Sequence, residues 1–509
     1  MSGGAVKGRG QSLRHLLGGL ADVSAANDCD VRGLAIDSRE ISAGDLFIAY
    51  RGESADGTQY IQDAIAAGAV AVVFDGDIEA VATNRVPMIH VSALQQKIGL
   101  IAARFFIQPS QQLWVVGVTG TNGKTSCCHF LSQALQLNGD KSGVMGTLGY
   151  GLPDALQVAT HTTPNPVVLQ SYLKKMVDAG ASSVVMEVSS HALDQARVAA
   201  VAFDVAIFTN LTRDHLDYHG DLESYGAAKQ KLFDMPGLSH AVINRDDDFG
   251  VHLLAALPAS VNAVAYGLLQ APQDAEARLA DGTRGVYGEV TRLDEAGIEM
   301  RVTTSWGNGV LRSEHLLGAF NASNLLAVLA VLLLMDLSLE KALALLVQVR
   351  NASGRMERMG GEGGLPLVVI DYAHTPHALQ NVLLALRDHC RGRLVCLFGC
   401  GGDRDSGKRP LMGAVAAQYA DEIVLTDDNP RSEDAALIVR DIMAGIETAK
   451  RVTVIHERAA AISAALKNST AADVVVVAGK GHELYQQVGE QKLPFNDREC
   501  VQAILREVA

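Results

Sequence analysis

The chain has 509 residues, a formal net charge of −14 at pH 7 and hydrophobic residues at 48% of its positions. This length predicts about three domains, at roughly one per 150 residues. The acidic balance argues against a nucleic-acid partner, because proteins that bind nucleic acids usually carry a basic surface. The 7 cysteines include no C-x-x-C pair, which favours reduced thiols in a cytoplasmic protein and argues against a structural zinc site.

Residues 1–11 are rich in glycine and lack an apolar segment, so we interpret them as a flexible tail and not as a signal peptide. Farther along, short apolar runs alternate with helical patterns, which predicts α/β architecture with largely parallel sheets. The expected strands are residues 69–74, 113–118, 183–187, 205–209, 241–244, 367–371, 394–399, 422–426 and 473–478.

A long helical pattern covers residues 324–349. Its apolar part, residues 325–335, is too short to span a membrane and predicts a buried helix. The alternation of strand and helix patterns is interrupted near residues 108–110 and again near residues 350–354. These two breaks predict domains at 1–109, 110–349 and 350–509.

An apolar run that ends in a glycine-rich turn, V-V-G-V-T-G-T-N-G-K-T-S, occupies residues 115–126. The backbone N–H groups of such a turn and the following helix N-terminus bind phosphate oxygens, while the lysine reaches the β and γ phosphates and the threonine ligates Mg²⁺. The residues expected at ATP are Gly120, Thr121, Asn122, Gly123, Lys124 and Thr125. Val118 stands where the G-x-x-x-x-G-K-[ST] pattern has glycine. The alternative is a chance glycine-rich turn, but a strand pattern precedes this turn and a helix pattern, residues 127–137, follows it.

Polar residues follow the next two strand patterns. Glu187 ends the run 183–187, where P-loop enzymes place a further magnesium ligand; a capping carboxylate is the alternative. The run 205–209 leads into L-T-R-D-H-L-D-Y-H, residues 211–219, which contains His215. Such a cluster alone is more often a hydrogen-bonded loop, but its place after a strand of a nucleotide-binding sheet favours a metal site.

Four ordered motifs resemble one family. T-G-T-N-G-K-T, M-E-V-S-S-H, N-L-T-R-D-H-L-D-Y-H and G-A-F-N-A-S-N, which begin at residues 119, 186, 210 and 318, resemble the Mur ligases, ATP-dependent amino-acid ligases of bacterial peptidoglycan synthesis. The resemblance runs from about residue 37 to residue 498. It implies an N-terminal UDP-substrate domain, a central P-loop ATP domain with a parallel sheet and a Rossmann-like C-terminal amino-acid domain. It also implies amide formation through an acyl phosphate, two Mg²⁺ ions, no membrane span and a cytoplasmic monomer.

The resemblance assigns the catalytic and metal-binding residues. Catalysis would rest on Lys124, Glu187, His215 and Lys229, and the magnesium ligands would be Thr125, Glu187, His215 and carbamylated Lys229. Addition of CO₂ to Lys229 would turn a cation into an anion that ligates or orients the second Mg²⁺. The sequence pattern alone predicts an exposed helical lysine there.

Further residues would contact the nucleotide and the UDP substrate. Asn324 matches the family's base-contacting asparagine, Arg355 would reach the phosphates and Asp371 the ribose. For Arg355 a surface ion pair is the alternative. The uridine site would include Ile36 and Ser38, with residues 53–55 nearby. UDP-N-acetylmuramoyl-L-Ala-D-Glu would contact His161, Thr162, Thr163, Ser189, Gln195 and Arg197.

The C-terminal segment sets the choice of amino acid. The expected pocket residues are Arg404, Asp428, Asn429, Pro430, Arg431, Gly479 and Glu483. Arg431, with Arg404, would clamp the distal carboxylate of meso-2,6-diaminopimelate, while Glu483 and the Gly479 carbonyl take the ammonium. L-Lysine lacks this carboxylate, so diaminopimelate is favoured and lysine is the alternative.

Three other functions share part of this pattern. An NAD-dependent oxidoreductase would use the loop at residues 399–404, but Arg404 replaces the third glycine of G-x-G-x-x-G. A P-loop kinase would explain the ATP motif but not residues 428–431 or 479–483. A non-catalytic nucleotide-binding regulator would not release phosphate in response to an amino acid.

Overall fold

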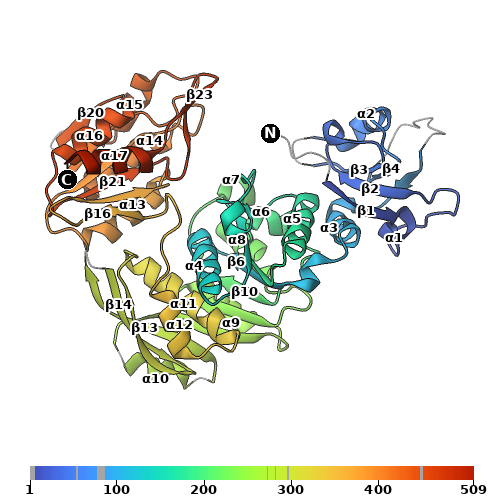
Figure 1. The fold of residues 1–509 in the computed structure, drawn as a ribbon, viewed down its shortest axis with the longest axis horizontal. Coiled ribbons are helices and arrows are strands. Elements are labelled where there is room, and N and C mark those ends of the chain that lie inside the picture. Colours follow the sequence, from blue (N-terminus) through green and yellow to red (C-terminus); the bar gives the residue numbers. More distant parts are fainter. Residues whose placement is uncertain are drawn as a thin grey trace. The chain divides into compact units, whose positions relative to one another are not determined.

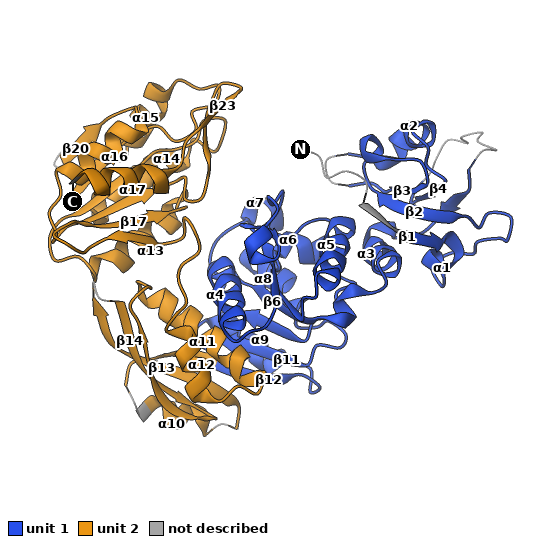
Figure 2. Cartoon of the chain, viewed as in Figure 1, with its two compact units in different colours: residues 1–265 blue, residues 266–509 orange. Residues whose placement is uncertain are grey.

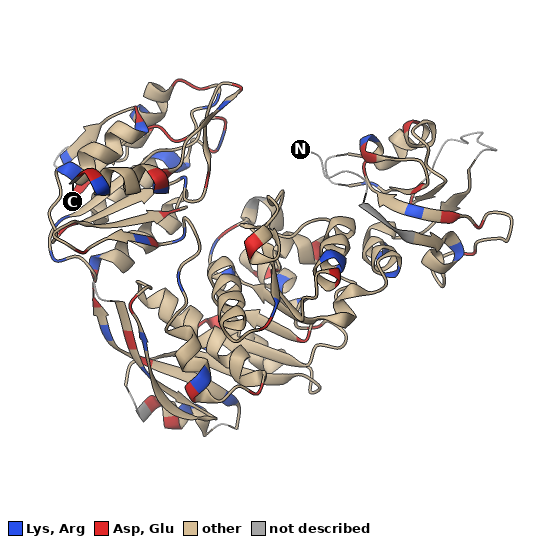
Figure 3. Ribbon diagram, viewed as in Figure 1, with Lys and Arg blue, Asp and Glu red and all other residues tan. Residues whose placement is uncertain are grey.

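The computed structural model describes residues 6–52, 55–76, 86–271, 273–280, 282–294, 297–446 and 451–508. The chain divides into two compact units, Met1–Ala265 and Tyr266–Ala509 (Figure 2). The division falls inside strand β12 (Asn262–Leu269). Acidic and basic residues are interspersed in both units (Figure 3).

The first part of unit 1 is a five-stranded sheet (Figure 1). Its strands, in spatial order, are β1 (Val6–Ser12), β2 (Asp30–Ala35), β3 (Asp45–Ala49), β4 (Ala71–Phe74) and β5 (Met88–His90). Its helices are α1 (Leu13–Leu17), α2 (Ile61–Ala66) and α3 (Leu94–Phe105). β1 pairs antiparallel with β2, and the other pairs are parallel. The predicted flexible tail is therefore wrong for residues 6–11, because backbone pairing orders a segment that has no apolar signal.

The second part of unit 1 is built around parallel strands in the order β11, β10, β6, β9 and β7, with β8 antiparallel at the edge. Their bounds are β6 (Trp114–Thr119), β7 (Ser142–Gly146), β8 (Gly149–Gly151), β9 (Ser183–Glu187), β10 (Val205–Phe208) and β11 (His240–Asn244). The helices are α4 (Lys124–Leu137), α5 (Pro166–Asp178), α6 (Ser190–Asp194), α7 (Leu216–His219), α8 (Leu222–Gln230) and α9 (Asp248–Ala256). Because β9, β6 and β10 are parallel neighbours, the segments that follow them meet at one sheet edge.

Unit 2 begins with an antiparallel layer. It consists of β13 (Arg284–Asp294), β14 (Gly297–Thr304) and β15 (Gly307–Ser313), with α10 (Gln273–Leu279), α11 (Ala319–Leu334) and α12 (Leu339–Leu346). α11 is buried along most of its length, as its apolar run predicted. The single helical pattern over residues 324–349 forms two helices instead, because Asp336 takes a left-handed backbone conformation and Ser338 caps α12.

The rest of unit 2 is a mostly parallel sheet in the order β16, β17, β21, β18, β19 and β20. The strands are β16 (Glu357–Gly360), β17 (Leu367–Asp371), β18 (Leu394–Phe398), β19 (Glu422–Leu425), β20 (Arg451–Val454) and β21 (Val474–Ala478), and a separate hairpin joins β22 (Tyr485–Val488) to β23 (Gln491–Pro494). α13 (Pro376–Arg387), α14 (Lys408–Tyr419) and α15 (Ala435–Met443) pack on one face, and α16 (Arg458–Lys467) and α17 (Asp497–Val508) pack on the other.

The predicted α/β class with largely parallel sheets is confirmed. The domain boundaries at 109/110 and 349/350 stay predictions. Among the described residues, no helix is both long and apolar enough to cross a membrane.

Candidate active site

The glycine-rich loop joins β6 to α4. Gly123 precedes the first residue of the helix, Lys124, with φ 87°, and Gly120 has φ 146°. A Cβ on Gly120 would lie 1.9 Å from the Thr209 hydroxyl oxygen. Glycine is therefore required at position 120 both by its backbone conformation and by the close approach of Thr209, which directly follows β10.

The segment after β10 supports this loop. Asn210 accepts hydrogen bonds from the Thr121 N–H through its carbonyl oxygen (2.8 Å) and from the Asn122 N–H through Oδ1 (2.9 Å). The Lys124 Nζ donates to the carbonyl oxygens of Gly120 and Thr121 at 2.8 and 2.9 Å. The N–H groups of Thr121 and Asn122 are thus used within the protein, which leaves the first turn of α4 to supply the N–H donors that an anion needs.

Glu187 ends β9 next to this helix turn and is 2% exposed. Its carboxylate accepts from the Thr125 hydroxyl at 3.0 Å and from the Thr147 N–H at 2.8 Å. Hydroxyl and carboxylate oxygens are the ligands that Mg²⁺ prefers, so this pair fits one magnesium ion. Among the described residues there is no group of three or more His, Cys, Asp or Glu that could hold a metal by itself.

Lys229 lies in α8 and is only 1% exposed. The sequence pattern predicted an exposed lysine at this position, and that prediction is wrong. Burial, with a smaller contribution from the Lys124 charge, lowers the pKa of Lys229 well below its ordinary value. The amine lies 4.0 Å from the centroid of the Tyr225 ring. CO₂ reacts with an amine in its neutral form, and the lowered pKa favours this form at Lys229.

His215 begins a cluster of aromatic and imidazole rings. It has φ 53°, its Nε2 lies 3.5 Å from Asp214 Oδ2, and its ring centroid is 4.9 Å from that of His191. His191 also packs on Tyr218, with ring centroids 4.2 Å apart. No site role was predicted for His191, Tyr218 or Tyr225, although His191 and Tyr218 lie within the M-E-V-S-S-H and N-L-T-R-D-H-L-D-Y-H motifs.

The residues predicted for the dipeptide lie beside Glu187. The Thr163 hydroxyl donates to the Glu187 carbonyl oxygen (2.8 Å) and accepts from the Ser189 N–H (3.1 Å). The Arg197 guanidinium donates to the Thr163 carbonyl oxygen and to Gln195 Oε1, both at 2.9 Å.

Two neighbours complete this set. The Thr162 and Thr147 hydroxyl oxygens are 3.2 Å apart. Burial, and then the Arg197 charge, lower the pKa of His161. The structure therefore brings together His161, Thr162, Thr163, Ser189, Gln195 and Arg197.

The predicted uridine residues lie in the five-stranded sheet region. Ile36 packs against its hydrophobic core, and Ser38 begins a short 3₁₀ turn that the Asp37 carboxylate caps. Glu53 and Ser54 lie outside the described residues. Tyr50, which the sequence did not indicate, lies within electrostatic range of Arg197: burial raises the pKa of Tyr50, and the guanidinium acts in the opposite direction.

In unit 2, Asp371 organises the segment that carries Arg355. The buried Asp371 carboxylate accepts from the N–H groups of Met356 (2.7 Å) and Ala373 (2.8 Å), and burial raises its pKa. The Arg355 guanidinium lies 5.0 Å from the Tyr372 ring centroid, and its Nε is buried without a hydrogen-bond partner among the described residues. Such a donor suits an anionic ligand. Asn324 is buried in α11, where its amide donates to Asn321 Oδ1 at 3.2 Å.

The predicted amino-acid residues follow the parallel strands β18, β19 and β21. Arg431 has φ 51°, and its NH1 donates to the Gly402 carbonyl oxygen at 2.6 Å, while Arg404 is exposed. Gly402 is in close contact with Pro430, whose carbonyl oxygen lies 1.9 Å from where a Cβ on Gly402 would stand. Two cations thus stand on adjoining loops.

The same set of loops also carries the Glu483 carboxylate, which belongs to a hydrogen-bonded network. Lys480 is fully buried, and its Nζ donates to Glu483 Oε2 (2.9 Å) and Asn429 Oδ1 (3.1 Å). Asn429 also donates to Glu483 Oε2 at 2.8 Å. A Cβ on Gly479 would lie 2.5 Å from Asp428 Oδ2. Lys480 was missed because nothing in a G-K-G-H-E sequence shows that the lysine is buried.

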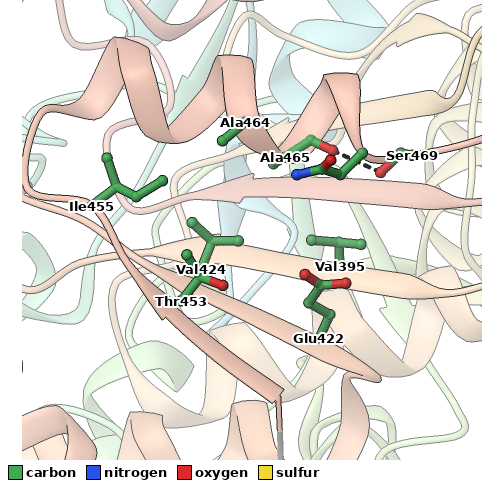
Figure 4. A pocket seen from close by; sticks show the side chains of 9 residues that line it. Val395, Glu422, Val424, Thr453, Ile455, Ala464, Ala465 and Ser469 are labelled. Atoms are coloured by element: carbon green, nitrogen blue, oxygen red, sulfur yellow. Dashed lines mark hydrogen bonds between the residues drawn. The ribbon is translucent and has the colours of Figure 1, made fainter.

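A separate small pocket lies between α16 and the beginnings of β18 and β19 (Figure 4). Its lining residues are Val395, Glu422, Val424, Thr453, Ile455, Ala464, Ala465, Asn468 and Ser469. None of them is a predicted site residue, and Val395 and Glu422 stand near the amino ends of their strands, opposite the loops just described.

Comparison with known families gives three matches in chain order. Residues 30–106 match the "Mur ligase family, catalytic domain", residues 118–332 the "Mur ligase middle domain" and residues 354–481 the "Mur ligase, glutamate ligase domain". These matches agree with the three-domain organisation expected from the sequence.

Similar proteins extend over nearly the whole chain. A relative from Ectopseudomonas mendocina (strain ymp), named UDP-N-acetylmuramoyl-L-alanyl-D-glutamate--2,6-diaminopimelate ligase, is 51% identical over 468 residues, 92% of this chain and 93% of the relative. A relative of the same name from Coxiella burnetii is 47% identical and covers 93% of this chain and 95% of its own. A solved structure of a ligase with this name has a TM-score of 0.72 and 32% identity, covering 98% of this chain and 99% of that one. The chain therefore belongs to the Mur ligase family and is an ATP-dependent ligase that forms amide bonds.

Proposed function

We propose that this ligase adds meso-2,6-diaminopimelate to UDP-N-acetylmuramoyl-L-Ala-D-Glu in cytoplasmic peptidoglycan precursor synthesis. The names of the relatives at 51% and 47% identity support this choice of substrates. The observation that carries the proposal is the guanidinium of Arg431, held at the Gly402 carbonyl in the same set of loops as the Lys480–Asn429–Glu483 network. The Arg431 guanidinium would match the distal carboxylate of diaminopimelate, and the Glu483 carboxylate, which Lys480 contacts at 2.9 Å, would accept from the ammonium.

The proposed reaction begins with attack of a D-glutamate carboxylate of the UDP substrate on the γ-phosphoryl group of ATP. ADP leaves, and the amine of the incoming amino acid then displaces phosphate from the acyl phosphate. Lys124 and the first turn of α4 would offset the charge on the transferred group, since phosphoryl transfer depends mainly on positioning and electrostatics. Arg197 and Thr163 would hold the dipeptide carboxylate next to Glu187.

Magnesium, held by Thr125 and Glu187, would neutralise part of the triphosphate charge when bound. His215 and a carbamate on Lys229 are proposed for the second ion. The lowered pKa of Lys229 supports this, because CO₂ adds to a neutral amine. Arg355 would contact the phosphates, Asp371 the ribose and Asn324 the base. We propose that the enzyme acts as a monomer.

Omission and substitution experiments test the proposal. We expect phosphate release only when ATP, the UDP-dipeptide and an amino acid are all present. Arg431→Ala should raise the KM for diaminopimelate by about thirtyfold or more, since truncating one partner of a buried charge pair costs roughly 2–5 kcal/mol. The KM values for ATP and the UDP-dipeptide should change little. Phosphate release without any amino acid, or equal losses for all three substrates, would contradict the proposal.

L-Lysine remains the alternative amino acid. It lacks the distal carboxylate, so a lysine enzyme would have no use for a cation at position 431. Removal of Arg431 need not create a lysine enzyme, because Arg404 remains and specificity also depends on what rejects the competitor.

A further inference from the structure

Arg409 lies in α14 and is almost completely buried, with 3% of its side chain exposed. Its NH2 donates to both carboxylate oxygens of Glu433 at 2.9 Å, and its NH1 donates to Asp441 Oδ2 at 3.0 Å. The same NH2 lies 3.4 Å from the Gly401 carbonyl oxygen. One guanidinium therefore contacts the loop after β18, the loop after β19 and helix α15.

These contacts continue toward the residues proposed to face the amino acid. Glu433 Oε1 accepts from the Asp403 N–H at 2.5 Å. The Asp403 carboxylate in turn accepts from the hydroxyl (2.6 Å) and N–H (3.2 Å) of Ser432. Asp403 and Ser432 are the direct chain neighbours of Arg404 and Arg431. Arg409 is thus linked to Asp403, the neighbour of Arg404, through two successive hydrogen bonds, and to Ser432, the neighbour of Arg431, through a third.

The backbone on both loops is held in uncommon conformations. Asp403 has φ 53° and Arg431 has φ 51°, values that non-glycine residues seldom adopt. Residues keep such conformations only where the surrounding contacts fix them. The hydrogen bonds that join the two loops include one from the Asp403 N–H to the Glu433 carboxylate and one from the Arg431 guanidinium to the Gly402 carbonyl oxygen.

We propose that Arg409 is a positioning residue, which sets the separation and orientation of Arg404 and Arg431 and so the preference for an amino acid with a distal carboxylate. This inference rests on the proposed function. A lysine at position 409 would keep the charge and much of the volume, but it cannot offer a planar fork to two carboxylates and a carbonyl group at once.

The test is Arg409→Lys in the full-length enzyme, with KM and kcat measured for each of the three substrates. We expect the KM for diaminopimelate to rise about tenfold, the scale of one well-placed polar contact, with kcat and the other two KM values within about twofold. Any slow turnover of L-lysine should be unchanged, because lysine has no carboxylate for the arginine pair. Equal effects on diaminopimelate and lysine, or no rise in KM, would overturn the proposal.

Arg393→Lys is the matched control. Arg393 also bridges two carboxylates, with Asp473 at 2.9 Å and Glu422 at 3.0 Å, but it precedes β18, at the other end of the same sheet. It should alter thermal stability without a selective change for diaminopimelate, and a similar selective change would count against the proposal.

If Arg409→Lys does not fold, Glu433→Gln is measured by the same criteria and should show a smaller rise in the same KM. No rise in that variant would refute the proposal. Failure of the wild-type enzyme to add diaminopimelate would instead refute the proposed function and, with it, this inference. A wild-type enzyme that adds diaminopimelate, with normal KM values in the variants, would refute the inference alone.

Discussion

Substitution of Lys229 by an apolar residue is expected to lower the activity of the enzyme without lowering the stability of its fold. Its folded pKa lies well below the unfolded value of 10.5, so between these two values the unfolded chain binds more protons and stability rises with pH. Lys229→Met removes this dependence and the cost of burying the amine. We expect it to lose most activity yet to melt no lower than the wild type at pH 7 without bicarbonate. Calorimetry and phosphate release measure the two effects, and a lower melting temperature would show that the lysine stabilises the fold.

The charge required at the same position can be tested separately. Lys229→Ala should lose most activity, and millimolar acetate should restore part of it, because the proposed role needs an anion and not an amine. Lys231→Ala is the control, since Lys231 lies two residues away, is about half exposed and pairs with Asp194 at 2.7 Å. Full activity of Lys229→Ala without acetate, or equal loss in the control, would refute the role.

Lys124 is expected to act on the phosphates and not on the fold. Its Nζ donates to the carbonyl oxygens of Gly120 and Thr121 within its own loop, and we expect Lys124→Ala to melt close to the wild type. Ligation should be abolished because charge neutralisation on the phosphates is lost. Ligation within about tenfold of wild type, with normal melting, would contradict the P-loop assignment.

At the scale of elements, the turn between β6 and α4 depends on glycine. Gly120→Ala would place a Cβ 1.9 Å from the Thr209 hydroxyl oxygen in a backbone with φ 146°. We expect the KM for ATP to rise at least about tenfold, because the displaced loop no longer presents the helix N-terminus to the phosphates. Gly139→Ala, just beyond the other end of α4, has φ 94° but nothing within 4 Å of its Cβ. It should keep normal kinetics, and an equal effect there would implicate general backbone strain.

Several strands with a strong local signal were predicted from the sequence, whereas β1, which depends on its pairing, was missed. β6, β9, β10 and β17 are mainly apolar and almost entirely buried, and they were predicted within one residue at each end. β1 is polar and glycine-rich, and only its pairing with β2 makes it a strand.

The site residues show the same difference between what a local sequence motif indicates and what depends on packing. Lys124 could be named from the glycine-rich turn that precedes it, Glu187 from its place at a strand end and Arg431 from the resemblance to the Mur ligases. The burial of Lys229, Lys480 and Arg409 could not be read from the sequence, because it depends on which elements pack over them.

For the whole molecule, the proposed reaction needs residues from both units. Lys124 and Glu187 belong to residues 1–265, whereas Arg355 and the amino-acid residues belong to residues 266–509. We therefore expect the units to close on their substrates. Small-angle scattering should show a smaller radius of gyration when an ATP analogue and the UDP-dipeptide are present together. Identical profiles with and without these ligands would contradict closure.

The most direct test of the central claim is a competition among amino acids. The wild-type enzyme is incubated with ATP, UDP-N-acetylmuramoyl-L-Ala-D-Glu and an equimolar mixture of meso-diaminopimelate, L-lysine and other diamino acids, and the products are identified by mass spectrometry. We expect the UDP-tripeptide that contains diaminopimelate to dominate. A product that contains lysine, or equal use of both amino acids, would contradict the assignment of Arg431 to the distal carboxylate.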